Sequence, residues 1–136
     1  MRARRQDDVA TDAQGNLIIG ISTRYRFAGA PVPPASPDNL DYYSYNAGPM
    51  HVIGLSSFFI GGTGPASPMT AWLKADLASV DRSVTPWVIL ITHAPMYNSN
   101  TAHTFDALGM LIDYEQIFLD GKVAVGFYGH VHAYER

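Results

Sequence analysis

Residues 123–136 read Val-Ala-Val-Gly-Phe-Tyr-Gly-His-Val-His-Ala-Tyr-Glu-Arg, and the rest of the chain can be organised around them. The apolar run Val123–Tyr128 predicts a buried strand. It breaks at Gly129, and two histidines follow, His130 and His132. In a regular strand these two side chains would point to opposite faces, so a shared site needs a turn, which Gly129 has the freedom to make. Because open α/β sheets bind ligands at the carboxyl ends of their strands, this placement predicts a metal site.

A third histidine strengthens that prediction. The apolar run Trp87–Thr92 has the length of a strand and is followed directly by His93. Parallel strands that both end in histidine would bring His93, His130 and His132 to one edge of the sheet, and neutral imidazole is a common ligand of zinc and iron. A lone histidine more often caps a strand or bonds a loop. A His-x-His pair with a third histidine after a second strand favours metal binding.

Upstream of these strands, the sequence predicts a β-hairpin. Two candidate strands, Tyr42–Tyr45 and Met50–Leu55, flank Asn46–Pro49, whose composition is typical of a turn. His51 falls inside the second of these strands, remote from the other histidines, and we expect a structural role for it. A short apolar run, residues 17–21, is a further strand candidate.

Two helices are predicted between the hairpin and the last strand. The first runs from about Pro68 to Val80, with serine at the N-cap and proline at N1. Lys74 and Asp76 fall off its apolar face. That face is formed by residues at helical spacing, Met69, Trp72, Leu73, Leu77 and Val80.

The second helix is expected between Asp106 and Leu119, with Gly121 as its stop. Four of its residues should point inward, namely Leu108, Leu111, Tyr114 and Phe118. The carboxylates in and around it are interpreted as solvated helix charges, and they are Asp106, Asp113, Glu115 and Asp120.

The order of these elements defines the fold class. Helix, strand, helix and strand follow the hairpin, and this order predicts parallel βαβ units with right-handed crossovers. We therefore expect an α/β fold with a mixed sheet, in which a β-hairpin precedes parallel βαβ units. The metal site should lie at the C-terminal ends of the strands.

Composition limits the classes of protein that this chain can belong to. Its 136 residues suffice for one domain with a core. The formal net charge of −3 argues against a nucleic-acid surface, and the absence of cysteine excludes disulfides and thiolate metal ligands. No apolar run approaches the roughly 20 residues that span a bilayer. Residues 1–16 form a polar segment without a secretory signal, compatible with a disordered tail.

Two segments resemble the purple acid phosphatases of the calcineurin-like metallophosphoesterase superfamily. Residues 129–136, Gly-His-Val-His-Ala-Tyr-Glu-Arg, are similar to the family's Gly-His-x-His signature. Residues 90–100, Leu-Ile-Thr-His-Ala-Pro-Met-Tyr-Asn-Ser-Asn, are similar to its Val-x-x-His motif and the following loop. The resemblance extends from about Tyr25 to the end. It implies a partial metallophosphoesterase sandwich, in which residues 17–136 form the C-terminal half of the catalytic domain.

The resemblance also implies roles for four histidines. His93 and His130 would bind a divalent metal (zinc, manganese or iron), and His132 would bind ferric iron. His103 aligns with a histidine that faces substrate and could hold the phosphate or protonate the leaving alkoxide. An exposed loop histidine without a catalytic role remains the alternative for His103.

Other motifs of the family are missing from this sequence. The family takes its bridging carboxylate, a second aspartate, an iron-binding tyrosine and an asparagine from motifs that begin Gly-Asp, Gly-Asp and Gly-Asn-His. The chain has no Gly-Asp dipeptide, and Gly15-Asn16 is followed by Leu17 instead of histidine. Three imidazoles without an anionic bridge hold a ferric–divalent pair poorly, because two close cations repel each other. We expect at most weak zinc or iron binding by this chain.

Two functions follow as hypotheses. The first is a metal-dependent phosphomonoester hydrolase, an acid phosphatase with a dinuclear site, by family. The second is a non-catalytic metal-binding remnant, or a half-domain that requires its N-terminal half or another chain. The expected substrates are small phosphate monoesters, and neither nucleic acid nor a membrane is an expected partner. The family is usually secreted or vacuolar, but residues 1–16 carry no signal peptide, so the sequence assigns no compartment.

Overall fold

The computed structural model of this protein describes residues 9–11, 17–19, 41–58 and 62–136. The chain forms two compact units, Met1–Val32 and Pro33–Arg136. In the first unit, β1 (Val9–Thr11) pairs antiparallel with β2 (Leu17–Ile19), so the predicted strand is present over its first three residues. Asn16 lies outside the described residues, as does the segment around Tyr25 where the family resemblance begins.

The second unit contains a four-stranded mixed sheet in the order β3-β4-β5-β6. Strands β3 (Tyr42–Ala47) and β4 (Met50–Leu55) form the predicted hairpin, with Ala47 opposite Met50. The hairpin turns at Gly48, whose φ of 57° suits glycine. Strand β5 (Trp87–Thr92) is parallel to β4, and β6 (Val125–Tyr128) is parallel to β5.

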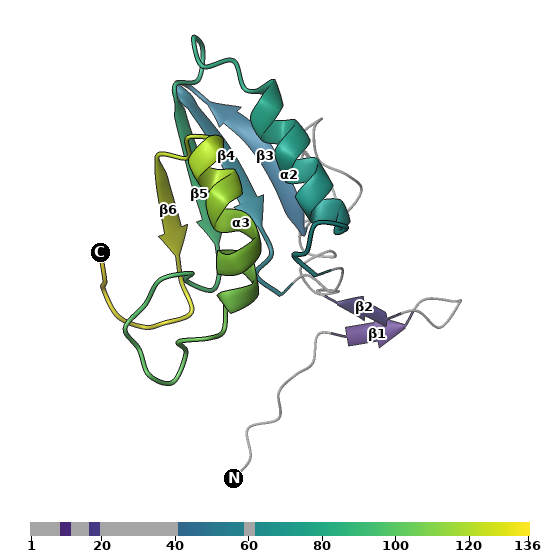
Figure 1. The fold of residues 1–136 in the computed structure, drawn as a ribbon, viewed down its shortest axis with the longest axis vertical. Coiled ribbons are helices and arrows are strands. Elements are labelled where there is room, and N and C mark those ends of the chain that lie inside the picture. Colours follow the sequence, from purple (N-terminus) through teal and green to yellow (C-terminus); the bar gives the residue numbers. More distant parts are fainter. Residues whose placement is uncertain (1–8, 12–16, 20–40, 59–61) are drawn as a thin grey trace. The chain divides into compact units, whose positions relative to one another are not determined.

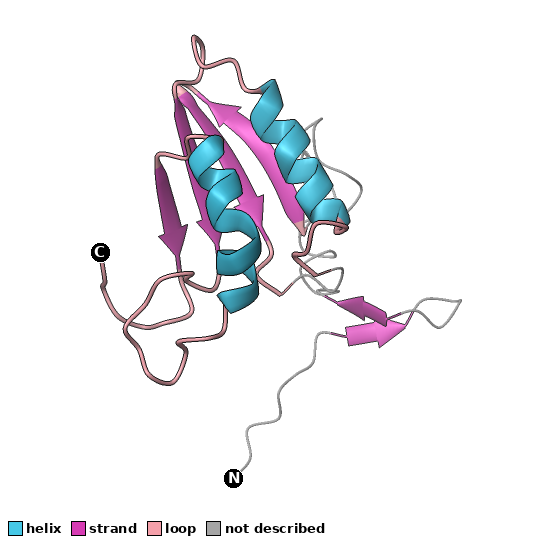
Figure 2. Ribbon diagram, in the orientation of Figure 1, coloured by secondary structure: helices cyan, strands magenta, loops and turns pink. Residues whose placement is uncertain are grey.

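Both helices of this unit lie on the same face of the sheet, as Figures 1 and 2 show. Helix α2 (Pro68–Ser79) connects β4 to β5, and α3 (Leu108–Asp120) connects β5 to β6. The predicted fold class, α/β with a hairpin followed by parallel βαβ units, is confirmed. The core lies between the helices and the sheet, and its fully buried side chains include Ile53, Met69, Leu73, Leu90, Met110 and Tyr114.

Two predictions about the helix faces are wrong. Asp76 was expected off the inner face of α2, but only 6% of it is exposed. In α3, Met110 is 1% exposed whereas Leu108 is 40% exposed, so methionine replaces the expected leucine in the core. Leu108 is the first residue of α3, and the core-facing stripe of the helix begins with Met110.

Asp76 is buried because it is the centre of a polar cluster between α2 and the sheet. The hydroxyl of Ser44 donates to its Oδ1 at 2.6 Å, and Nε2 of His51 lies 2.9 Å from its Oδ2. The other ring nitrogen of His51, Nδ1, lies 2.7 Å from Oδ1 of Asn46. His51 therefore links the hairpin to α2, as expected for a structural histidine.

Gly121 ends α3 as predicted, but its role is to allow close packing. Its φ is −72°, and the left-handed residue of this turn is Lys122, with a φ of 52°. A Cβ atom at Gly121 would lie 2.8 Å from Cδ1 of Leu77 in α2. A side chain at this position would therefore force Leu77 to shift, and it would also lie 3.0 Å from the carbonyl oxygen of Ile117.

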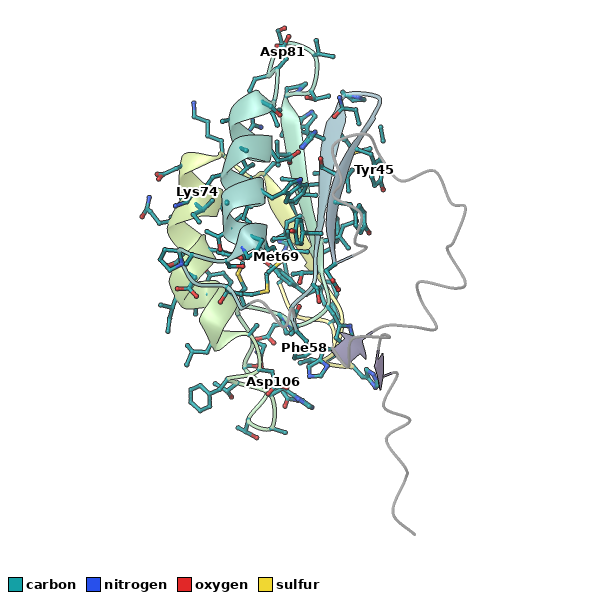
Figure 3. The ribbon with its side chains drawn as sticks, turned by 90° about the vertical axis from the view of Figure 1, so that its right-hand side faces the viewer. Tyr45, Phe58, Met69, Lys74, Asp81 and Asp106 are labelled. Atoms are coloured by element: carbon teal, nitrogen blue, oxygen red, sulfur yellow. The ribbon has the colours of Figure 1, made fainter. Side chains whose placement is uncertain are left out.

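The second face of the sheet carries apolar side chains that no described residue covers. The sequence predicted a buried strand over Val123–Tyr128, but β6 begins at Val125 and is largely exposed. With both helices on one face, every second side chain of the strands points away from the core (Figure 3). The large exposed side chains on that face are Tyr45 (43%), Met50 (39%), Trp87 (58%), Ile91 (41%), Val125 (41%) and Phe127 (60%).

None of the helices within the described ranges is both long and apolar enough to cross a membrane.

Candidate metal centre

The carboxyl ends of β5 and β6 bring two of the predicted histidines into contact. The strands run in parallel register with Thr92 beside Tyr128, so the residues that follow them leave the sheet together. The amide of Gly129 donates to the carbonyl of His93 at 2.9 Å. Beyond this bond, Nδ1 of His130 lies 3.0 Å from Nε2 of His93. Parallel pairing thus juxtaposes histidines that are 37 residues apart in the sequence.

The backbone turn that permits this contact is at His130. Its φ is 63°, in the left-handed region that residues other than glycine rarely adopt. The φ of Gly129 is not positive. The sequence-based assignment of the turn to Gly129 is therefore wrong. Gly129 packs directly against the His93 ring, because a Cβ there would lie 3.5 Å from Nδ1 of His93. A left-handed non-glycine residue costs about 1–2 kcal/mol, and such conformations concentrate at functional sites.

His103 reaches the same place from the loop between β5 and α3. Two asparagines shape this loop, because Oδ1 of Asn98 accepts from the amide of Asn100 and Oδ1 of Asn100 accepts from the amide of Ala102. The His103 amide then donates to the carbonyl of Asn100 at 3.2 Å. The ring centroid of His103 lies 4.6 Å from that of His130. Asn98 is therefore loop scaffold, and it helps to place His103 at the strand ends.

Asp106 links His103 to His130, which in turn contacts His93. Its Oδ2 lies 2.8 Å from Nδ1 of His103 and 2.7 Å from Nε2 of His130. These hydrogen bonds, from His103 first and His130 second, lower the pKa of the Asp106 carboxyl below its ordinary value of 3.8. The carboxylate is therefore ionised throughout the neutral and mildly acidic range.

The interpretation of Asp106 as a solvated helix charge is wrong. Asp106 precedes α3 and lies in the turn that starts at His103, whose carbonyl accepts from the Asp106 amide at 3.2 Å. The sequence signal that could have identified Asp106 is its spacing of three residues from His103, because a single turn brings side chains at this spacing together. The other carboxylates near α3 have partners away from the cluster, with Asp113 accepting from Thr63, Glu115 from Tyr97 and Asp120 from Gln116.

His132 makes none of these contacts within the part of the chain that the structure describes. Glu135 bonds the loop instead of the histidines, because both of its oxygens accept from the amide of Ser99, at 2.9 and 3.1 Å. This bond ties the chain end to the loop that presents His103. The structure thus gathers His93, His103 and His130 with Asp106, and it leaves His132 outside the cluster.

Two residues that the sequence analysis did not single out support the cluster. Ser57, which follows β4, accepts from the amide of Ala94 at 2.7 Å and lies 2.6 Å from the hydroxyl of Thr92, so it holds the backbone on both sides of His93. Phe58 lies with its ring centroid 5.9 Å from that of His130. Figure 3 shows Phe58 and Asp106 at the end of the unit opposite to Asp81.

The chemistry of these side chains suits a transition metal. His103, Asp106 and His130 each offer one ligand atom, and these atoms all lie within 4.8 Å of one another. Imidazole nitrogen with one carboxylate oxygen is the donor set of catalytic zinc sites and of non-haem iron(II) sites. No lysine or arginine among the described residues bonds to Asp106, so its charge is balanced only by N–H donors.

Comparison with known proteins assigns the family. The sequence model described as calcineurin-like phosphoesterase matches residues 20–134. The chain therefore belongs to the calcineurin-like phosphoesterase family. Within it, purple acid phosphatases are among the relatives, so the resemblance predicted from the two histidine motifs is confirmed.

Three proteins illustrate this similarity. Purple acid phosphatase 15 of Arabidopsis thaliana is 36% identical over 129 residues, which cover 95% of this chain and 23% of the relative. Phosphoenolpyruvate phosphatase of Allium cepa is 44% identical over 97 residues, which cover 70% of this chain and 19% of the relative. The solved structure of purple acid phosphatase PPD1 from seeds of yellow lupin, Lupinus luteus, has a TM-score of 0.59 and 25% identity over 67% of this chain and 16% of that one. The chain spans about a fifth of the length of its relatives.

Proposed function

We propose that this chain supplies the C-terminal half of the catalytic domain of a metal-dependent phosphomonoester hydrolase of the purple acid phosphatase type. The observation that carries the proposal is the 3.0 Å contact between ring nitrogens of His93 and His130 at the ends of adjacent parallel strands. These are the residues that the family motifs designate as ligands. The division of the chain into residues 1–16 and a half-domain of residues 17–136 belongs to the same proposal.

The family implies a dinuclear metal site, and the histidines present here fit part of it. His93 and His130 would hold the divalent ion, which is zinc, manganese or iron, and His132 would hold ferric iron. When bound, such a pair supplies charge stabilisation for the phosphoryl oxygens and a nucleophilic hydroxide. The bridging carboxylate would come from outside the residues discussed above, since the chain has no Gly-Asp motif.

His103 is proposed to act on the substrate. Its Nδ1 bonds Asp106, so Nε2 is the ring nitrogen that can face a phosphate oxygen or the leaving alkoxide. Asp106 fixes this orientation, because a ring with one nitrogen held by a carboxylate keeps one tautomer. With its side chain 38% exposed, His103 is accessible to a small phosphate monoester. A His103 ring that carries a second proton on Nε2, as imidazolium beside the Asp106 carboxylate, could donate that proton to the leaving oxygen, which would be general acid catalysis.

Zinc binding by single-histidine variants tests this proposal. We expect the chain to bind zinc weakly, and His93→Ala and His130→Ala to weaken binding by at least about tenfold, as the loss of ligands should. Isothermal titration calorimetry provides the measurement, and Asp120→Asn, at an exposed helix end, is the matched control. If both histidine variants bound zinc as the control does, the strand-end histidines would not be ligands and the proposal would fail.

The sheet face that no described residue of the second unit covers favours the half-domain version of the alternative function. An apolar face of this kind on a single sheet is unusual for a monomer, because large exposed apolar patches mark interaction sites. We propose that the remaining half of the phosphoesterase domain covers it, since about four fifths of the length of the relatives lies outside the part that this chain matches. Supplied as part of the same product or as a partner chain, that half would complete the sandwich.

Charged substitutions on this face provide a second test. In the isolated chain, Phe127→Glu should change the free energy of unfolding by less than about 0.5 kcal/mol, because the side chain is already 60% exposed. It should also reduce self-association and binding of a hydrophobic dye. Ile112→Glu, at a 72% exposed position on α3, controls for the added charge. Equal effects of the two substitutions on dye binding would show that the sheet face is not a hydrophobic interaction surface.

A further inference from the structure

We propose that this chain contains its own mononuclear metal site, formed by His103, Asp106 and His130. This donor set differs from the one that the family motifs designate, because it includes a carboxylate from this half of the domain and excludes His132. It would bind one divalent ion of the zinc or iron(II) type. The inference goes beyond the proposed function, which requires ligands that this sequence does not contain.

The convergence of ligand atoms carries the inference. Nδ1 of His103 and Nε2 of His130 both point at one carboxylate oxygen, Oδ2 of Asp106, at 2.8 and 2.7 Å. In a tetrahedral zinc site with metal–ligand bonds of about 2.0–2.1 Å, ligand atoms lie roughly 3.3 Å apart. These two separations are about half an ångström shorter, and all three ligand atoms lie within 4.8 Å of one another, so small rotations of the side chains would open the space for an ion.

Proton positions are compatible with such a site. Without an ion, each of the two nitrogens carries the proton that it donates to Asp106. With an ion, the proton of His130 would move from Nε2 to Nδ1, and that of His103 from Nδ1 to Nε2. Both rings stay neutral, so each presents a lone pair to the cation. The fixed carboxylate supplies the negative charge that three imidazoles alone would lack.

His93 has a supporting role in this arrangement. Its Nε2 lies 3.0 Å from Nδ1 of His130, which is the nitrogen that would carry the relocated proton. A metal-bound histidine commonly donates its second N–H to an acceptor that fixes the ring. Nε2 of His93 would be that acceptor, once the proton that it donates to Nδ1 of His130 in the absence of an ion has moved to Nδ1 of His93. The ring of Phe58, 6.1 Å from that of His93, covers one side of the pair.

The site is also accessible to an ion. The side chains of His103, Asp106 and His130 are 38%, 36% and 22% exposed, so an ion can enter without opening the core. Two of the three ligands come from a single turn, which makes a local binding unit, and the third comes from the end of β6. Coordination would therefore tie the loop before α3 to the sheet.

The discriminating experiment compares Asp106→Asn with His132→Ala in the whole chain. We expect Asp106→Asn and His103→Ala to weaken zinc binding, measured by calorimetry, by at least about tenfold, and His132→Ala to change it by less than about twofold. Cobalt(II) should give a tetrahedral visible spectrum with the parent chain and lose it in Asp106→Asn. Asp120→Asn is the control for loss of a carboxylate, and circular dichroism checks that each variant is folded.

The opposite pattern would overturn the inference. If His132→Ala and His93→Ala weakened binding while Asp106→Asn did not, the ion would occupy the family's ligand set, and the proposed function would stand without this site. If neither Asp106→Asn nor His130→Ala changed the affinity, both proposals would fail. Asp106→Glu gives a further check, because a longer side chain that keeps the carboxylate should retain more of the affinity than asparagine does.

Discussion

The isolated chain, loaded with iron and zinc, is expected to hydrolyse an aryl phosphate at least about a thousandfold more slowly than the usual enzyme range of about 1–10³ s⁻¹. Efficient two-metal hydrolysis requires a bridge that fixes both ions and the hydroxide between them. The sequence has no Gly-Asp motif to provide that bridge, and Asp106 supplies one carboxylate beside His103 and His130. A single weakly held ion can still polarise a phosphate, so slight activity is expected.

Turnover and colour together test this expectation. The release of an aryl alcohol at mildly acidic pH gives the rate, and His103→Ala should lower any residual activity because it removes the proposed proton donor. We also expect no charge-transfer band in the visible region, since the family's iron-binding tyrosine belongs to a missing motif. Turnover above about 1 s⁻¹ with this chain alone, or a purple product, would show that the chain completes the dinuclear site by itself.

A large loss of stability is expected from Asp76→Ala, although Asp76 lies in a surface helix and far along the sequence from the site. The side chains of His51 and Asp76 form a buried pair, since they are 9% and 3% exposed and Nε2 of His51 lies 2.9 Å from Oδ2 of Asp76. Truncation of Asp76 leaves His51 without this partner. Breaking such a pair typically costs about 3–5 kcal/mol. The Ser44 hydroxyl loses its acceptor in the same substitution.

Urea denaturation followed by tryptophan fluorescence measures this loss, with Lys74→Ala as the control. Lys74 is exposed in the same helix, so its truncation should change the free energy of unfolding by less than about 0.5 kcal/mol. The double variant with His51→Ala should be less destabilised than the sum of the single variants, because the two residues share one interaction. A cost for Asp76→Ala close to that of Lys74→Ala would mean that the cluster contributes nothing to folding.

The hairpin and helix–strand order were predictable because they depend on local chemistry. Turn residues between two β-rich runs indicated the hairpin, and the Ser-Pro pair indicated the start of α2 at Pro68. The Ser67 hydroxyl donates to the carbonyl of Gly62 instead of capping the helix. Apolar runs followed by histidine identified β5 and β6, and parallel pairing of those strands followed from the intervening helix. The metal-site prediction for His93 and His130 used only this topology.

Errors arose where distant contacts override local pattern. Asp76 has the polarity of a surface residue, yet Ser44 and His51 on the hairpin satisfy it in the core. Likewise, the strand predicted as buried over Val123–Tyr128 is largely exposed in β6, because burial depends on what packs against each face of the sheet. A sequence pattern reports how apolar a strand is and does not report what packs against it.

The sequence by itself determined the family, the α/β order and the histidines at the strand ends, because motifs and periodicity are local properties of the chain. Only the tertiary structure decided that Asp106 lies between His103 and His130, while His132 stands apart from the cluster. The left-handed backbone at His130 directs one ring of the His-x-His pair to Asp106. The physical reason is that a metal site is defined by side-chain directions in three dimensions, and these depend on turns and packing between segments that are remote in sequence.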